Sequence, residues 1–418
     1  MTTARGAYRY YVLFMLIVVY TVNFIDRQIV GILAPAIKAE LSLSDTQLGL
    51  LGGLAFAIFY TALGIPIARL ADRHSRVWIM TISLFVWSLF TALGGATTSF
   101  VQLFLARVGV GVGEAGGVAP AYSLISDYFP RHERARALAV YSFGIPLGGT
   151  CGVLFGGLIA STLNWRAAFV IVGLAGVVLV PIFRLTLRDP ERGRFDPPQA
   201  STDQPSLRTT LLFLAAKPSF WGLSMAAGSA AALSYGLAFW MPSFYLRSFH
   251  MTLMEVTLFY SALLLGGGCV GIWAGGWVTD KLVAKRPAAY ALVPAAAFAL
   301  SIPCYIGAVL APSPTAVFLF SLLPQALGLL WLAPIISAIQ HLVQANMRST
   351  ASAAFLFINN VIGLGVGTVF FGFISDALSS RYGDDSLRYA ILSGLVFYVI
   401  SAVILLFTAR RLANDLTT

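Results

Sequence analysis

The sequence predicts an all-α membrane protein with twelve transmembrane helices in two six-helix bundles. Three observations lead to this fold class. Only 11% of the 418 residues are charged and 58% are hydrophobic, whereas about a quarter of a typical soluble chain is charged. Apolar runs of about 20 residues, the length that crosses a bilayer, follow one another with short connections. The two halves of the chain also share short sequence patterns at a constant spacing.

Charged residues, prolines and glycines divide the chain into twelve apolar runs. The first run is too long for the apolar core of a signal peptide, so we interpret it as a retained helix. The expected spans are 10–34, 47–70, 77–98, 101–126, 135–161, 165–187, 218–245, 253–279, 288–310, 315–341, 350–377 and 387–409.

One long polar stretch separates the sixth run from the seventh. Residues 188–217 combine Pro, Asp, Gln and Arg in their first part, a composition that predicts a mobile linker, with a short surface helix at 205–216. The expected domains are an N-terminal bundle at 1–187, a cytoplasmic linker at 188–217 and a C-terminal bundle at 218–418.

The two halves repeat two short patterns at one spacing. Residues 44–47 (SDTQ) and 252–255 (TLME) are both capping boxes. Asp72-Arg73 ends the second span and Asp280-Lys281 ends the eighth, and the differences 252 − 44 and 280 − 72 are both 208. Such an internal repeat is how many secondary transporters are built, although chance agreement of common capping residues is the alternative.

The basic residues predict the topology. The net charge is +10, but the Lys and Arg residues are scattered, which argues against a nucleic-acid partner. With a cytoplasmic N-terminus, 20 of the 27 Lys and Arg residues lie on the cytoplasmic side, 5 lie outside and 2 lie within spans. The positive-inside rule therefore predicts a multi-pass protein of the cell (inner) membrane with both termini in the cytoplasm.

Neither a metal site nor a cofactor is expected. The three cysteines lie inside apolar runs without CxxC spacing, and no GxxxxGK[ST] signature for nucleotide binding occurs. An intramembrane enzyme would need a nucleophile with a base or a metal cluster, yet the four histidines fall at predicted helix ends or loops. We therefore expect no enzyme; the cysteines are Cys151, Cys269 and Cys304, and the histidines His74, His132, His250 and His341.

Four charges fall inside predicted spans and are the candidate functional residues. They are Asp26 and Arg27 in the first span and Arg107 and Glu114 in the fourth. Charges in the hydrocarbon region are costly and are functional candidates by default. Asp26 and Arg107 are both roughly 9–12 Å below the outer surface, and Glu114 is about 10 Å deeper on nearly the same helix face as Arg107.

Two interpretations of this group compete. Asp26 and Arg107 can form a buried ion pair that only fixes helix register. Alternatively, they can act as a switch, because a carboxylate paired with arginine holds a proton less tightly than one left alone in an apolar site. In that case Arg27 and Arg107 offer forked donors to a phosphate or carboxylate of a substrate.

The motifs around these residues resemble the major facilitator superfamily and, within it, a bacterial-type member of the Spinster family. Residues 64–76 (GIPIARLADRHSR) are similar to the superfamily signature between helices two and three, although Ala68 and Ser75 stand where glycines are usual. Residues 23–27 (NFIDR) and 107–115 (RVGVGVGEA) are similar to Spinster motifs, and the likeness covers most of residues 20–175. The resemblance implies that Asp72, Arg73 and Asp280 act as a conformational latch.

The resemblance also implies a function. It suggests a proton-coupled transporter of an anionic amphipathic lipid, such as a lysophospholipid or a sphingosine-1-phosphate-like molecule, that works by alternating access. Asp26, Arg107 and Glu114 would serve proton coupling and gating, and Arg27, Arg107 and Glu114 would contact the head group. The expected partners are this substrate, protons and membrane lipids, and the expected state is a monomer. However, residues 116–118 (GGV) replace a more polar stretch of the animal members, so the substrate can differ.

Two alternatives stay open. A proton-coupled transporter of a small organic anion or a sugar acid would share the fold. A non-transporting membrane receptor or scaffold is the alternative of another class, although it has no need of opposed charges at matched depth.

Overall fold

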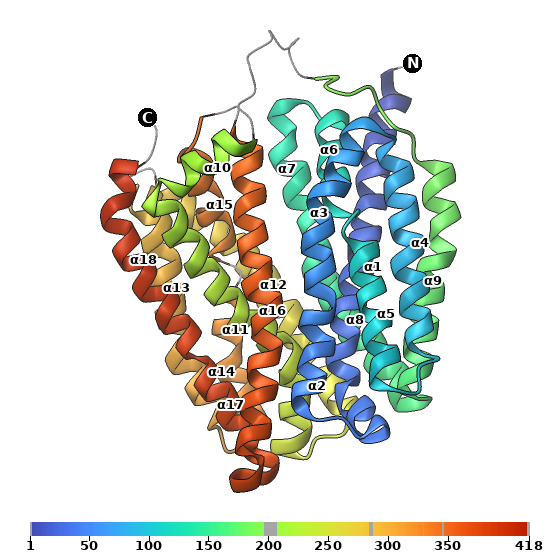
Figure 1. Cartoon of the computed structure of the whole chain (residues 1–418), viewed down its shortest axis with the longest axis vertical. Helices are drawn as coiled ribbons and strands as arrows, with labels where there is room; N and C mark the ends of the chain where they lie inside the picture. The colour runs from blue at the N-terminus through green and yellow to red at the C-terminus, as the bar shows by residue number, and fades with distance from the viewer. Residues whose placement is uncertain (1, 196–206, 284–286, 329, 345–346, 416–418) are drawn as a thin grey trace. The chain divides into compact units, whose positions relative to one another are not determined.

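A computed structural model describes residues 2–195, 207–283, 287–328, 330–344 and 347–415 (Figure 1). These described residues form helices and turns without any strand. Eight continuous helical stretches among them are long and apolar enough to cross a membrane, and two shorter apolar helices accompany them. The all-α prediction is confirmed.

The backbone contacts divide the chain into two compact units. Unit 1 comprises Met1–Leu43, Leu50–Thr202 and Leu253–Ser261, and unit 2 comprises Ser44–Gly49, Asp203–Thr252 and Ala262–Thr418. Each unit therefore contains one short segment from the other half of the sequence.

Unit 1 holds the helices of the N-terminal half. Helix α1 packs along α8, α4 packs on α5 and α9, and α3 packs on α5. The elements are α1 (Thr2–Leu41), the π-helix η1 (Leu50–Leu54), α3 (Ala55–Arg73), α4 (Arg76–Gly94), α5 (Phe100–Glu114), α6 (Val118–Tyr128), α7 (Arg131–Ser142), α8 (Gly144–Thr162) and α9 (Trp165–Thr186).

Unit 2 holds the helices of the C-terminal half. Helix α11 packs on α16 and α18, and α13 packs on α14 and α18. The elements are α2 (Asp45–Gly49), α10 (Leu207–Ala215), α11 (Pro218–Phe249), α12 (Leu253–Val283), α13 (Ala289–Val309), α14 (Pro314–Leu327), α15 (Leu332–His341), α16 (Arg348–Tyr382), the 3-10 helix η3 (Gly383–Asp385), α17 (Ser386–Gly394) and α18 (Val396–Asp415). The start of α12 belongs to unit 1.

Several predicted spans consist of more than one helix. The fourth span is α5 followed by α6, joined by a turn at residues 115–117. Gly116 and Gly117 lie in this turn, and glycine is unfavourable inside a helix because it has the most backbone freedom to lose. The other divided spans are 47–70, 135–161, 315–341 and 387–409.

The helix boundaries agree with the internal repeat. Helix α1 ends at Leu41 and α11 ends at Phe249, while α2 begins at Asp45 and α12 begins at Leu253. The differences 249 − 41 and 253 − 45 are both 208, the spacing found in the sequence. The first capping box is also formed, since Ser44 N donates to Gln47 Oε1 at 2.9 Å and Gln47 N donates to Ser44 Oγ at 3.1 Å.

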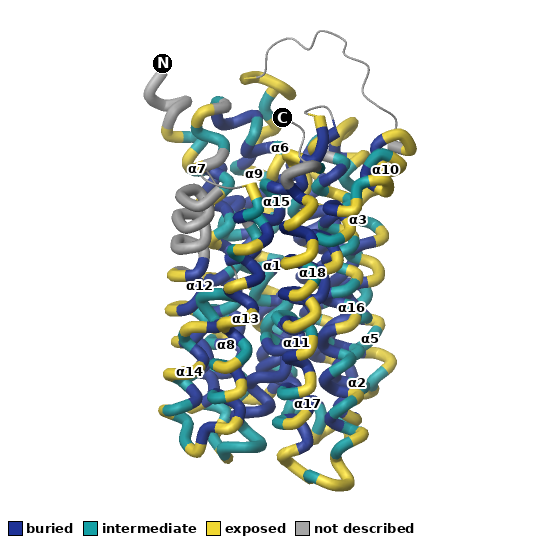
Figure 2. The backbone as a smooth tube through the Cα atoms, turned by 90° about the vertical axis from the view of Figure 1, so that its left-hand side faces the viewer, coloured by how far each residue is buried: buried dark blue, intermediate teal, exposed yellow. Residues whose placement is uncertain are grey.

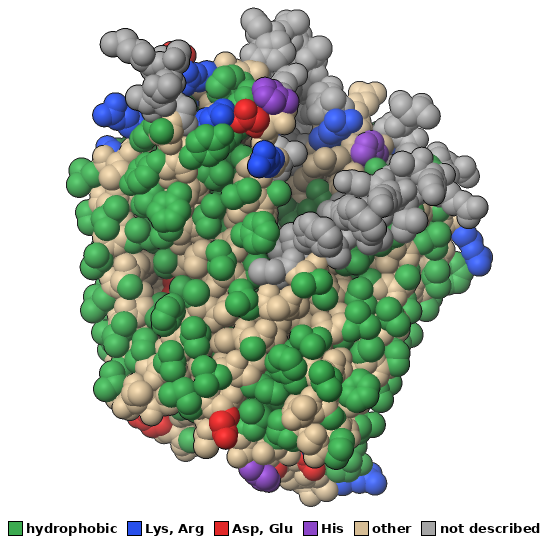
Figure 3. All heavy atoms as spheres, turned by 180° about the vertical axis from the view of Figure 1, so that it is seen from behind, with side chains coloured by type: hydrophobic (Ala, Val, Ile, Leu, Met, Phe, Trp, Pro, Cys, Tyr) green, Lys and Arg blue, Asp and Glu red, His purple; other side chains and the backbone are tan. Residues whose placement is uncertain are grey.

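Exposed apolar side chains line single faces of the outer helices. On α9 the exposed apolar residues recur every three or four positions, while Phe169 and Phe183 on the opposite side are buried. Figure 2 shows exposed and buried positions alternating along the helices. On the face shown in Figure 3, hydrophobic side chains cover most of the surface and charged ones gather at its two ends. Such apolar stripes suit contact with lipid rather than water; on α9 the stripe is Ile171, Leu174, Val178, Ile182 and Leu185.

The predicted linker is described only in part. Its surface helix, predicted at 205–216, is confirmed as α10. Residues 196–206, on which the prediction of mobility mainly falls, lie outside the described residues.

Candidate functional site

The four charges predicted to lie within the membrane are brought together in unit 1. Helix α1 carries Asp26 and Arg27, and α5 carries Arg107 and Glu114. The exposed fractions of Asp26, Arg107 and Glu114 are 1%, 2% and 0%, and that of the Arg27 side chain is 13%. Two carboxylates and two guanidiniums therefore share one buried site whose formal charges balance.

Arg27 and Glu114 form the ion pair of this site. Nε of Arg27 donates to Oε2 of Glu114 at 2.7 Å. The guanidinium also lies against three aromatic rings, 5.0 Å from the ring centre of Phe24 and 4.7 Å from those of Phe56 and Tyr60. A charge-assisted hydrogen bond in a low-dielectric site is stronger than a neutral one, so this pair is a strong link between α1 and α5.

The ion pair predicted between Asp26 and Arg107 is not formed among the described contacts. Nη1 of Arg107 instead donates to the main-chain carbonyl of Asp26 at 3.3 Å. Both carboxylate oxygens of Asp26 are buried without a hydrogen bond of normal geometry to a described residue. A single methylene group joins the carboxyl group of Asp26 to its Cα atom, so the carboxyl group stays close to α1. The longer side chain of Arg107 reaches from α5 to the α1 backbone.

Asp26 is nevertheless surrounded by polar groups. Those that act on it electrostatically are Glu114, Arg107, Thr91 and Arg27, which come from α1, α4 and α5. A buried carboxyl without a direct ionic partner can exchange a proton without first breaking an ion pair. The structure thus gives the two acids different environments.

Close helix packing fixes α5 at this level. A Cβ atom added to Gly111 would lie 2.6 Å from the carbonyl oxygen of Phe56 on α3, and one added to Gly113 would lie 2.5 Å from the main-chain nitrogen of Trp87 on α4. Only glycine allows these approaches. The glycines between Arg107 and Glu114 therefore determine how closely α3 and α4 pack around the charged residues.

The predicted latch residues have a different setting. Asp72 and Arg73 are exposed at the end of α3. Asp280 is part of α12, but its side chain lies outside the described residues. Arg76, the last residue of the same motif, is by contrast only 1% exposed.

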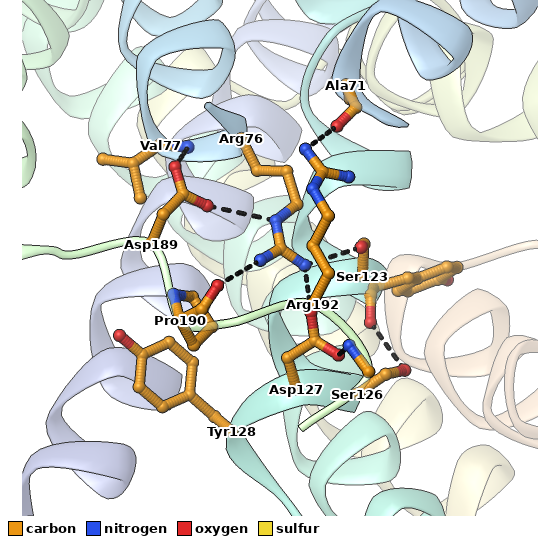
Figure 4. A network of polar contacts seen from close by, with 12 residues as sticks. Ala71, Arg76, Val77, Ser123, Ser126, Asp127, Tyr128, Asp189, Pro190 and Arg192 are labelled. Atoms are coloured by element: carbon orange, nitrogen blue, oxygen red, sulfur yellow. Dashed lines mark hydrogen bonds and ion pairs between the residues drawn. The ribbon is translucent and has the colours of Figure 1, made fainter. Parts of the chain in front are cut away.

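Arg76 is the centre of a buried polar network (Figure 4). It forms ion pairs with Asp127 at the end of α6 and with Asp189, whose Oδ1 lies 3.0 Å from Nε of Arg76. Its remaining donors reach Oγ of Ser123 at 2.9 Å and the carbonyl oxygen of Pro190 at 3.0 Å. One arginine thus joins α4, α6 and the segment after α9.

The first residues of the predicted linker are bound to unit 1 rather than free. Asp189 accepts hydrogen bonds from Oγ of Ser75 and, at 3.2 Å, from N of Val77 at the start of α4. Nη2 of Arg192 donates to the carbonyl oxygen of Ala71 at the end of α3, at 2.7 Å (Figure 4). It also donates to the carbonyl oxygen of His74, at 2.6 Å. An anion at a helix N-terminus and a cation at a helix C-terminus both complement the helix dipole.

Sequence reasoning missed a further ion pair, which lies in unit 2. Nη1 and Nη2 of Arg247 donate to the two carboxylate oxygens of Asp45, each at 2.7 Å. Asp376 accepts hydrogen bonds from N of Asp45 at 3.0 Å and N of Thr46 at 2.8 Å, and so caps the start of α2. Asp45 lies inside the first predicted capping box, and no sequence pattern links it to Arg247, which follows 202 positions later.

Comparison with known proteins gives a consistent family assignment. Residues 16–368 match the model of the Major Facilitator Superfamily. An MFS-type efflux pump of Mycolicibacterium smegmatis is 37% identical over 380 residues, which cover 90% of this chain and 87% of the relative. The Drosophila melanogaster protein spinster is 28% identical over 89% of this chain and 63% of its own length.

Two further matches bear on fold and substrate. The crystal structure of a bacterial homologue of the human lysosomal transporter Spinster, in an inward-facing and unoccupied conformation, has a TM-score of 0.89 and 31% sequence identity, and the match covers 98% of this chain and 99% of that chain. A hexuronate transporter of Bacillus subtilis is 25% identical over 94% of this chain and 93% of the relative.

Proposed function

Because the chain belongs to the major facilitator superfamily, as a membrane transporter of the Spinster type, we propose that it couples the transport of an anionic amphipathic lipid to protons. The lipid class is that of lysophospholipids and sphingosine-1-phosphate-like molecules. Transport proceeds by alternating access, in which the substrate site opens to one side of the membrane at a time. The transporter family excludes an enzyme and a scaffold as primary roles.

The observation that carries this proposal is the ion pair of Arg27 with Glu114 beside Asp26. Buried charges in membrane helices are retained where they bind substrates or relay protons. An anionic head group supplies the same kind of acceptor to Arg27 that Glu114 supplies at 2.7 Å. Substrate and Glu114 therefore compete for one guanidinium.

This competition links substrate binding to protonation. When the head group takes Arg27, the Glu114 carboxylate loses its ionic partner in a site that is 0% exposed. A buried carboxylate that has lost its direct ion pair is unfavourable, and in this scheme the group gains a proton instead. Asp26, which has no ion pair to break, is the proposed site through which the proton enters or leaves.

Arg107 has a supporting role in this scheme. Its contact with the main-chain carbonyl of Asp26 holds α5 against α1, and its positive charge lies near both acids. It therefore offsets part of the negative charge while the proton moves, and it is a second contact for a head group.

The aromatic neighbours of Arg27 favour an amphipathic substrate over a fully hydrated one. The rings of Phe24, Phe56 and Tyr60 pack against the guanidinium, so the cation is presented from an apolar surface. Apolar surface next to an anion-binding group suits a molecule with an anionic head and an acyl chain.

Asp72 and Arg73 remain proposed latch residues, because they are exposed and free to contact another element in one conformation, and Asp280 is their proposed counterpart in the repeat. The distribution of basic residues, 20 against 5, supports a multi-pass protein of the cell membrane with both termini in the cytoplasm. We propose a monomer, surrounded by membrane lipids, as the working unit.

A sugar acid or another small organic anion is the second candidate substrate. The similarity to the hexuronate transporter favours it, since a carboxylate would pair with Arg27 as a phosphate does. In this case the aromatic rings would stack on the sugar rather than border an acyl chain.

A ligand panel across pH tests the proposed substrate class. Purified protein in lipid nanodiscs is heated with a lysophospholipid, a sphingosine-1-phosphate analogue or a hexuronic acid, and the unfolding temperature is measured. We expect the lipid anions alone to raise this temperature, with an effect that depends on pH. Stabilisation by the hexuronic acid alone would overturn the lipid assignment.

A further inference from the structure

The ring of Phe56 contacts both arginines of the charged site. The guanidinium carbon of Arg27 lies 4.7 Å from the ring centre and that of Arg107 lies 5.7 Å from it. Phe56 is 1% exposed, so its ring is buried next to both guanidinium groups. One neutral side chain thus lies against both positive charges of the site.

The position of this ring is fixed by the backbone around it. Phe56 follows the π-helix η1 as the second residue of α3. The hydrogen bonds of a π-helix join residues five positions apart, one more than in an α-helix. Such turns occur frequently at functional sites. The carbonyl group of Phe56 packs directly against Gly111 of α5, so α3 and α5 cannot separate or slide without moving the ring.

An aromatic ring at position 56 is electrostatically favourable next to the guanidinium groups of Arg27 and Arg107. The two faces of a phenyl ring are negative, and each attracts a cation within about 6 Å of the ring centre. The ring can therefore lower the cost of holding two guanidiniums in one buried site without introducing another carboxylate. A carboxylate at this position would compete with Glu114 for Arg27.

We infer that Phe56 is a positioning residue that orients the Arg27 guanidinium toward Glu114. Phe24 and Tyr60 also border Arg27, and Tyr60 stacks on Phe56 with ring centres 5.0 Å apart. Phe56 differs from both because its ring also lies against Arg107. Its effect on transport rests on the proposed function, whereas its effect on Arg27 does not.

Ring fluorination tests the inference while preserving the shape of the side chain. Mono-, di- and trifluorophenylalanine at position 56 withdraw negative charge from the ring faces in steps. Because the substrate competes with Glu114 for Arg27 in the proposed function, a weaker hold on Arg27 should favour the substrate. We expect the apparent substrate affinity to rise in the same order, by about tenfold in total, which corresponds to roughly 1.4 kcal/mol. Equal affinity across the series would overturn the inference, since packing alone is unchanged by these replacements.

A double-mutant cycle separates this inference from the proposed function, because it needs no substrate. The thermal stability of the full chain is compared for Phe56→Leu, Arg27→Lys and the double variant, and residues that interact give non-additive effects. We expect non-additivity for this pair even if no lipid is transported. Additive effects would contradict the positioning role.

Phe169→Leu provides the matched control for packing. Phe169 is also a 1% exposed phenylalanine of unit 1, and its described ring partner is Trp165 rather than a cation. Its replacement should lower stability without coupling to Arg27→Lys. Coupling of similar size at both positions would show that loss of packing, not the contact with Arg27, explains the result.

Discussion

Nε of Arg27 donates to Oε2 of Glu114 across 2.7 Å, and this contact joins α1 to the last residue of α5. The pair lies among aromatic rings and is largely buried, with side-chain exposures of 13% for Arg27 and 0% for Glu114, and Arg107 adds a further positive charge near Glu114. Removing one partner of a buried ion pair is costly because the other charge remains. In the proposed transport cycle, the anionic head group of the substrate replaces Glu114 as the partner of Arg27.

Arg27→Lys should weaken binding of the anionic head group. Lysine keeps the positive charge but loses the planar fork of donors that matches phosphate and carboxylate. We expect an affinity loss of about tenfold, or roughly 1.4 kcal/mol, measured by ligand-induced stabilisation. Unchanged affinity for every anion tested would assign the head group to another residue.

Asp26→Asn should make transport insensitive to pH while substrate still binds. Asparagine has nearly the shape of aspartate but carries no titratable proton, and Asp26 is buried beside Glu114, Arg107, Arg27 and Thr91. The measurement is the uptake rate into proteoliposomes as a function of pH.

Glu133→Gln is the control for that experiment. Glu133 is a partly exposed carboxylate paired with Arg9, away from the charged site. Its variant should keep the pH profile of the natural protein. A profile preserved in Asp26→Asn and lost in Glu133→Gln would be incompatible with the proposed proton site.

Arg76→Ala should mainly lower stability, whereas Arg73→Ala should mainly change transport. Arg76 neutralises Asp127 and Asp189 inside unit 1, so its loss should lower the free energy of unfolding by about 3–5 kcal/mol. Arg73 is exposed, so its loss should change transport through the proposed latch and leave stability nearly unchanged. Thermal unfolding and uptake are measured on both variants; equal stability of the two would refute the buried network.

Gly111→Ala should destabilise the protein, whereas Gly64→Ala should not. The new Cβ atom at position 111 would lie 2.6 Å from the carbonyl oxygen of Phe56, while nothing lies within 4 Å of a Cβ atom at position 64. At an open helical position alanine is favoured over glycine by roughly 0.5–1 kcal/mol. Unfolding temperatures compare the two; a Gly111→Ala variant as stable as the natural protein would mean that α3 and α5 are not held in close contact.

The sequence allowed the charged residues to be chosen but not their partners. A charge within an apolar run can be recognised from the sequence alone. The structure brings together the four charged residues that were selected in this way, Asp26, Arg27, Arg107 and Glu114. Their pairing depends on side-chain length and helix rotation, which a depth estimate along the helix axis ignores. In this structure Arg27 therefore pairs with Glu114, whereas Arg107 contacts Asp26 through the main-chain carbonyl.

Contacts between distant segments were also beyond prediction. Arg76 binds Asp189, which lies 113 residues later in the chain. In unit 2, Asp45 forms an ion pair with Arg247 that no local motif encodes. The helix repeat, by contrast, follows from short capping patterns whose spacing is preserved in the chain. Local signals determine where helices begin and end, whereas the pairing of ions is decided by tertiary packing.

The most direct test of the account is transport driven by a pH gradient in proteoliposomes, with lysophospholipid as substrate and Glu114→Gln as the variant. Glutamine keeps the size of the side chain but can neither hold the negative charge nor exchange a proton. We expect the natural protein to move the lipid in proportion to the imposed gradient, and Glu114→Gln to bind the lipid but no longer respond to the gradient. An undiminished response in Glu114→Gln would contradict the claim that substrate and proton compete at the Arg27–Glu114 pair.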